Sequence, residues 1–156
     1  MLTRIKSLLK KVKDEPQEAN ELSEKLITAA LMVEVMRSDH HLDEREEAAF
    51  RRVLVDFLDL ETEAASELRE LAQETTAQAT SLYEFTSQVN ASFDYEAKLR
   101  LISNMWEIAF ADGEIDRYED GVIRRVAELT YVSHSDFIRK KLEVRDARRE
   151  TTDSQP

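Results

Sequence analysis

Hydrophobic residues recur every three to four positions along almost the whole chain, which is the period of an amphipathic α-helix. The strict alternation of apolar and polar residues that indicates half-buried strands is nearly absent. The pattern therefore predicts an all-α protein, a compact bundle of seven to eight helices. The expected helices cover residues 2–13, 20–37, 43–57, 61–75, 81–92, 95–110, 117–130 and 134–148.

The chain divides into a body and two distinct ends. The sequence predicts a basic amphipathic helix over residues 1–15. Residues 1–13 carry five basic groups and no acidic one, and their Leu and Ile residues form an apolar stripe. We expect that stripe to pack on the acidic body; the alternative is peripheral contact of residues 2–13 with an anionic membrane. Residues 16–150 form the predicted helical domain, and residues 151–156 have nothing to bury and are expected to be disordered.

Composition narrows the classes of function. The chain has 156 residues and a net charge of −11. It contains no Cys, and this excludes disulfides, thiol chemistry and zinc–thiolate sites. An acidic surface is a poor partner for nucleic acid, because phosphate binding needs a basic face. No apolar stretch approaches the roughly 20 residues that span a bilayer. We expect a cytoplasmic protein, with the inner face of the membrane as the alternative location.

An internal repeat is the most informative feature of the sequence. Residues 26–54 and 99–127 align without a gap, and nine of 29 positions are identical. The identities favour charged positions, which are normally the freest on a helix surface. The shared pattern is E-x4-D-x3-D-x2-E-x4-R-R, and it predicts two pseudo-symmetric helix-turn-helix units.

The repeated acids are candidate metal ligands. Glu34 and Glu107 fall among apolar residues near a helix end, where a carboxylate needs a partner. The turn and the start of the next helix supply three further acids in each repeat. All-oxygen ligands without Cys favour Ca²⁺, Mg²⁺ or Mn²⁺. The predicted ligands are Glu34, Asp39, Asp43, Glu46, Glu107, Asp112, Asp116 and Glu119.

Two structural interpretations compete with a metal site. Asp-x-x-Glu is a capping box, so Asp43 with Glu46 and Asp116 with Glu119 could cap their helices. Ser133 with Asp136 predicts another such cap. The repeated arginines could also form ion pairs with the acids and cross to the other repeat. These arginines are Arg51, Arg52, Arg124 and Arg125.

Catalytic motifs are missing from the sequence. It contains no catalytic triad, nucleophile elbow, Walker loop or H-E-x-x-H motif. Residues 112–119 match the second half of an EF-hand loop, but the earlier ligand positions fall on Ile108 and Phe110, so a true EF-hand is not expected. We therefore expect a non-enzymatic module with a protein partner. It is either metal-responsive or a scaffold in which the acids are caps and arginine pairs.

The acidic turns resemble those of the tellurite-resistance TerB family. The segments that carry the likeness are residues 32–47 and 106–119, with residues 82–86 and 132–137 also similar. The likeness covers roughly residues 20–145 and is most specific at A-x-A-D-G-E-I-D-x-x-E. The nearest subgroup is related to the N-terminal domain of the co-chaperone DjlA.

The resemblance implies a helical bundle of two related halves, a metal site at the eight repeated acids, and a bacterial, cytoplasmic role in tellurite or envelope stress. The chain departs from the co-chaperone pattern because it has no J-domain His-Pro-Asp and no transmembrane helix. Stimulation of Hsp70 is therefore not expected. In the first turn, His40 and His41 replace the more typical D-G-like sequence, which weakens or alters that half-site.

Overall fold

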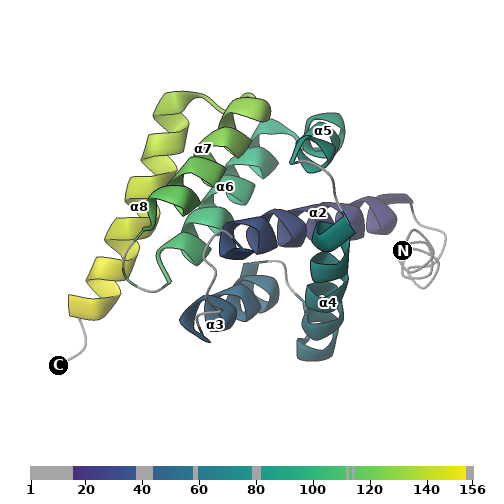
Figure 1. Ribbon diagram of the computed structural model, residues 1–156, viewed down its shortest axis with the longest axis horizontal. Helices are drawn as coiled ribbons and strands as arrows, with labels where there is room; N and C mark the ends of the chain where they lie inside the picture. The colour runs from purple at the N-terminus through teal and green to yellow at the C-terminus, as the bar shows by residue number, and fades with distance from the viewer. Residues whose placement is uncertain are drawn as a thin grey trace.

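The computed structural model describes residues 16–37, 44–57, 60–78, 82–111, 113 and 115–153, with side chains over 24–36, 44–56, 60–74, 82–111, 113 and 115–149. Every regular element in these ranges is a helix, which confirms the all-α prediction (Figure 1). The elements are α2 (Pro16–Arg37), α3 (Glu44–Arg52), a π-helical turn η1 (Val53–Phe57), α4 (Thr62–Gln78), α5 (Tyr83–Ser92), α6 (Tyr95–Ala109), α7 (Arg117–Leu129) and α8 (His134–Asp153).

Local sequence explains where several helices begin and end. Pro16 opens α2, because the fixed φ of proline suits the first helical position and its missing N–H needs no partner there. Asp94 caps α6, and its Oδ1 accepts a hydrogen bond of 2.8 Å from the Ala97 amide. The turn after α7 places Tyr131 at φ 61°, with Val132 N donating to Ala127 O at 2.9 Å. This is the bonding pattern of a Schellman motif, in which a residue of left-handed conformation ends the helix.

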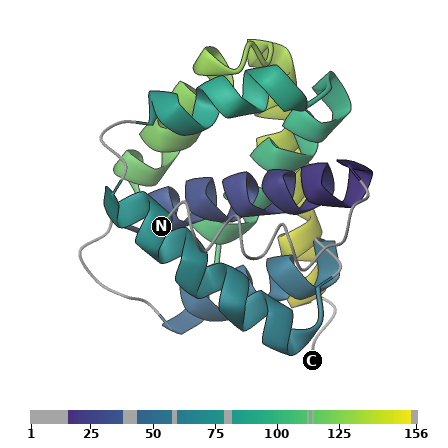
Figure 2. The same cartoon turned by 90° about the vertical axis from the view of Figure 1, so that its right-hand side faces the viewer.

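Helix α2 lies at the centre of the molecule. It contacts α4, α5, α6 and α7, and Figures 1 and 2 show it running between the pair α3 and α4 and the group α5 to α8. Ala29, Ala30, Leu31, Met32 and Val35 are all 0% exposed, so this helix is apolar on every side over its second half. A helix of this kind is stable only when other elements cover it completely.

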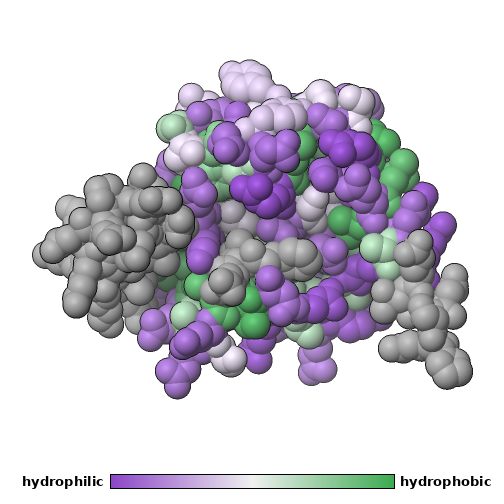
Figure 3. Space-filling model, turned by 180° about the vertical axis from the view of Figure 1, so that it is seen from behind, coloured by the Kyte–Doolittle hydropathy of each residue, from purple (hydrophilic) through white to green (hydrophobic). Residues whose placement is uncertain are grey.

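The second repeat supplies the other half of the core. Trp106 of α6 is fully buried and its ring packs on Phe137 of α8, with ring centroids 5.2 Å apart. Contacts between the repeats are reciprocal, since α3 packs on α6 and α7 packs on α2. The exterior seen in Figure 3 is covered mainly by hydrophilic residues, with smaller hydrophobic areas between them. This division matches the alternation of faces read from the helical period.

The ends of the chain follow the predictions in part. Helix α8 continues to Asp153, so residues 151–153 are helical and the expectation of disorder was wrong for them. Residues 154–156 and the predicted helix 2–13 lie outside the described residues. Among the helices that the structure describes, none combines the length and hydropathy needed to cross a membrane.

Candidate functional site

The structure describes five of the eight predicted acidic ligands. Glu34 and Glu107 are half-buried, on α2 and α6, and Asp116 is exposed at the start of α7. Glu46 and Glu119 occupy matching positions of the repeat and are the two most buried acids, at 1% and 0% exposure. Asp39, Asp43 and Asp112 lie outside the described residues, as do His40 and His41.

Glu107 joins the two repeats through ion pairs. Its Oε2 lies 3.7 Å from Arg52 Nη2 at the end of α3 and 3.5 Å from Arg148 Nε on α8. The Glu107 side chain is 18% exposed, so the pairs lie at the edge of the core. The contact with Arg52 crosses from the second repeat to the first, as the ion-pair interpretation predicted.

Arg148 also binds the C-terminal end of α6. Its Nη2 donates to the carbonyl oxygen of Glu107 and its Nη1 to that of Phe110, both at 3.0 Å. The last carbonyls of a helix have no partner within the helix and carry the negative end of its dipole. A guanidinium at this place therefore donates to two backbone acceptors and lies beside one carboxylate; the Phe110 oxygen also accepts from the Gly113 amide. The repeat pattern does not include Arg148, so the sequence did not identify it as a site residue.

Asp116 is a helix cap, as predicted. It is the N-cap residue of α7, and its Oδ1 accepts a hydrogen bond of 3.2 Å from the amide of Tyr118. One of its oxygens is therefore directed to the backbone.

The other repeated arginines do not form the kind of cross-repeat ion pair that Arg52 forms. Arg124 pairs with Asp120 one turn earlier on the same helix, at 3.4 Å, and its guanidinium lies 5.2 Å from the centre of the Phe137 ring. Asp120 also accepts from Lys141 of α8 at 2.9 Å. Arg51 and Arg125 are exposed. Only part of the arginine pattern thus serves contact between the repeats within the described residues.

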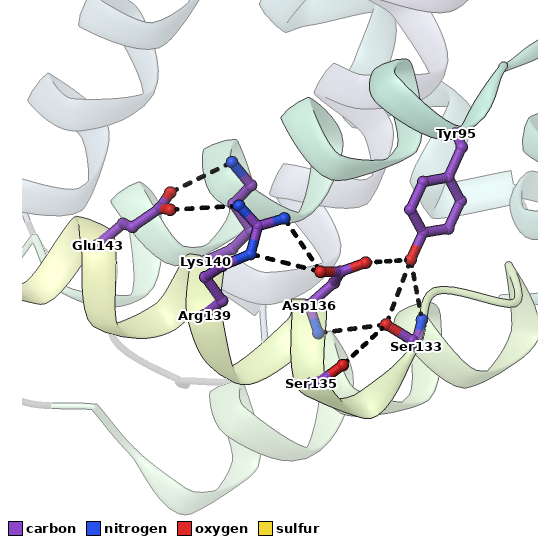
Figure 4. Close-up of polar contacts among 7 residues, drawn as sticks. All are labelled: Tyr95, Ser133, Ser135, Asp136, Arg139, Lys140 and Glu143. Atoms are coloured by element: carbon purple, nitrogen blue, oxygen red, sulfur yellow. Dashed lines mark hydrogen bonds and ion pairs between the residues drawn. The ribbon is translucent and has the colours of Figure 1, made fainter.

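A second polar network joins the N-terminal ends of α6 and α8 (Figure 4). Tyr95 donates its hydroxyl proton to Asp136 Oδ2 and accepts from the Ser133 amide at 3.2 Å. Ser133 Oγ accepts from the Asp136 amide at 3.2 Å, which is the predicted cap. The hydrogen bond from Tyr95, followed by those from Arg139 and Ser133, lowers the pKa of Asp136 below its usual value.

The described residues do not by themselves form a metal centre. Among them, no three acidic or histidine side chains lie close enough together to hold an ion. The guanidinium groups of Arg52 and Arg148 lie beside the Glu107 carboxylate, in the place that a bound cation would take. Asp116 is engaged by a backbone amide. The donor set seen here fits ion pairing and capping.

The described elements define the class of protein, which is a compact all-α domain. The profile of the family described as tellurite resistance protein TerB matches residues 25–142, so the chain belongs to the TerB family. The match does not distinguish the subgroup related to DjlA, which stays a prediction. Searches of curated proteins and of solved structures found no match.

Proposed function

We propose that this TerB-family protein is a non-enzymatic interaction module whose second-repeat acids serve as internal structural groups. The observation that carries the proposal is the position of Glu107 between Arg52 and Arg148. One carboxylate there bridges α3, α6 and α8, three helices far apart in the chain. The acids thus hold the fold together, which leaves binding of a protein partner to the outer surface.

The tie to α8 supports a scaffold role. Helix α8 packs mainly on α6 and α7. Its C-terminal half is rich in charged residues. Arg148 in this half donates to α6, and Lys141 just before it donates to α7, so polar contacts add to the burial of Val144. A helix held in this way presents a long, charged outer face in a fixed orientation, which suits recognition of another protein.

Thermal melts of chelator-treated protein test the scaffold proposal. We expect the same midpoint with and without Ca²⁺, Mg²⁺ or Mn²⁺ at about 1 mM. A cation at about 100 times its dissociation constant would add about 2.7 kcal/mol and raise the midpoint by several degrees. Glu107→Gln should lower the midpoint in every buffer, because it leaves Arg52 and Arg148 without their charged acceptor. A cation-dependent rise that Glu107→Gln abolishes would overturn the proposal.

A divalent-cation site at the turns is the second candidate function. It is favoured by two buried acids at matching positions of the repeat, Glu46 at 1% and Glu119 at 0% exposure. These two glutamates follow the turns that carry Asp39, Asp43 and Asp112 in sequence. Carboxylate oxygens are the ligands that Ca²⁺, Mg²⁺ and Mn²⁺ prefer.

Acid variants distinguish the second candidate from the first. If a cation raises the midpoint, Glu119→Gln and Asp112→Asn should each abolish the rise. Glu128→Gln, an exposed acid on the same helix as Glu119, is the matched control and should retain it. A rise that persists in both turn variants would place the cation elsewhere.

The family description, tellurite resistance protein, supports a role in tellurite stress. The chain contains no Cys, so direct thiol chemistry on tellurite is unavailable to it and any contribution would act through a partner. Growth of a strain lacking the protein on potassium tellurite, with and without the Glu107→Gln form supplied back, tests this role. Equal growth of all strains would remove it.

A further inference from the structure

A cavity of about 550 Å³ opens between α2 and α6. Glu24, Lys25 and Thr28 of α2 form one wall, a long stretch of α6 forms the floor, and Lys140 of α8 reaches the far side. Small-molecule sites in proteins typically measure about 300–1,000 Å³, so the cavity is large enough for a ligand. Glu107 borders the cavity, but its ion-pair partners Arg52 and Arg148 do not line it.

Asn104 is the polar group at the floor of this cavity. It is 6% exposed and lines the cavity from α6. Within the described part of the chain, its side-chain amide has no hydrogen-bond partner. Its nitrogen and oxygen are not sealed inside the core, so they face the cavity, where a bound group can form hydrogen bonds with them. The matching position in the first repeat is Leu31, which is fully buried in the core.

The charges around the cavity leave two basic groups available. Lys140 pairs with Glu143 at 3.2 Å, and Glu107 faces Arg52 and Arg148. Glu24 has a polar interaction of its own, and Glu96 lies within electrostatic range of Arg139. Lys25 and Arg100 also line the cavity, and neither forms an ion pair with another described residue. The cavity is therefore suited to an anionic group.

Apolar residues also line the cavity. Phe93, in the turn before α6, and Ala97 and Leu101 of α6 are all buried, and they lie beside the polar Ser103 and the acids Glu96 and Glu107. An apolar surface with a few placed polar groups is the usual composition of a ligand site. A molecule that fits would carry a carboxylate toward Lys25, Arg100 and Asn104 and lay an apolar body along the other side.

We propose that the cavity between α2 and α6 binds a small amphipathic carboxylate, held by Asn104, Arg100 and Lys25. The carboxylate accepts hydrogen bonds from the amide and from the two cations, and the apolar body covers the Phe93 side. This site is separate from the repeated-acid turns, and it stands whether or not a divalent cation binds there.

Octanoate is the probe that tests the site, with octanol and octylamine as its neutral and cationic analogues. Titrations are followed by the side-chain amide signal of Asn104 in proton–nitrogen NMR spectra of the full chain. We expect octanoate to shift this signal and to bind about tenfold or more tightly than either analogue, because a charge-assisted hydrogen bond is worth at least one factor of ten. Equal binding of the three probes, or no shift at millimolar octanoate, would overturn the proposal.

Two variants and a control locate the binding. Arg100→Gln should weaken octanoate about tenfold and leave octanol unchanged. Asn104→Leu restores the residue type of the first repeat and should abolish octanoate binding without loss of the fold; in this variant the backbone amide signals of Ala97 and Leu101 report the titration. Arg117→Gln removes an exposed arginine outside the cavity and should bind octanoate as the unchanged protein does. Octanoate binding that survives both cavity variants would refute the assignment.

Discussion

Replacing Arg148 with methionine should destabilise the protein more than any other single change on the surface of α8. Methionine keeps an unbranched apolar stem but removes the guanidinium that donates to Glu107 O and Phe110 O. The carbonyl of Glu107 then loses this donor, and the carbonyl of Phe110 keeps only the amide of Gly113, at 3.0 Å. The Glu107 carboxylate keeps only Arg52, at 3.7 Å. We therefore expect α6 and α8 to separate more easily.

The magnitude follows from the geometry around Arg148. Each hydrogen bond from a charged donor contributes about 1.5 kcal/mol at the lower end of its range, and the partly exposed ion pair adds up to about 1 kcal/mol. Water can replace part of this, because the Arg148 side chain is 28% exposed. The expected loss in free energy of unfolding is about 2–3 kcal/mol, equivalent to about 5–10 °C in the melting midpoint for a chain of this size.

Urea denaturation followed by circular dichroism measures the loss. Arg149→Met is the matched control: Arg149 is the next residue on α8, it is exposed, and its loss should change stability by less than about 0.5 kcal/mol. A double-mutant cycle with Glu107→Gln should give a coupling energy of about 1 kcal/mol. If Arg148→Met and Arg149→Met unfold at the same urea concentration, the reasoning about the α6 end is refuted.

Two further predictions concern the α6–α8 end of the bundle. Tyr95→Phe removes the hydrogen bond that contributes most to lowering the pKa of Asp136, so a carbon-detected NMR titration should give a higher Asp136 pKa in the variant; an unchanged value would exclude Tyr95 as the main cause. Because the folded pKa is lowered, the Asp136 carboxylate stabilises the fold above its unfolded pKa of about 3.9, and this contribution is lost as pH falls through the lowered folded value. Tyr131→Gly should raise the free energy of unfolding by about 1 kcal/mol, because an exposed tyrosine at φ 61° pays the cost of a left-handed backbone that glycine avoids. Tyr131→Ala keeps that cost, so urea melts in which alanine stabilises as much as glycine would contradict this cause.

The helical period predicted most of the fold because burial on one face produces it. Helix α6 was expected over residues 95–110 and runs Tyr95–Ala109, since Asp94 and the turn after Phe110 mark both ends. The period failed at helix ends that carry no apolar stripe. Residues 16–19 of α2 have no such stripe in the sequence, and after Val144 the described side chains of α8, through residue 149, include no further buried hydrophobic one, so both helices exceed their predicted ranges.

The candidate site was predictable only as far as the repeat extends. The repeat identified Glu107 and its cross-repeat partner Arg52, and the capping box identified Asp116. Arg148 lies 41 residues beyond Glu107, and no local pattern joins them. One signal could have found it: Arg148 follows the buried Val144 by one helical turn, so its side chain leaves α8 on the core-facing side.

Matching positions of the repeat have also acquired different partners. Glu47 and Asp120 are related by the alignment, yet Glu47 bonds to Arg69 of α4 through both oxygens, whereas Asp120 pairs with Lys141 of α8 and with Arg124. Aligned positions of the two segments thus share an acidic residue, but the helix that lies against each position determines its partner. Sequence identity between the repeats therefore predicts the acids better than it predicts their contacts.

The length of α8 has a practical consequence for the limits of the domain. The family profile ends at residue 142, whereas Val144 is buried and Arg148 reaches back to the end of α6. The segment that matches the family profile is thus shorter than the folded domain. A protein trimmed to the profile would lose the buried side chain of Val144 and both donors from Arg148 to α6. Fusions and truncations should instead keep the chain through Asp153, where α8 ends.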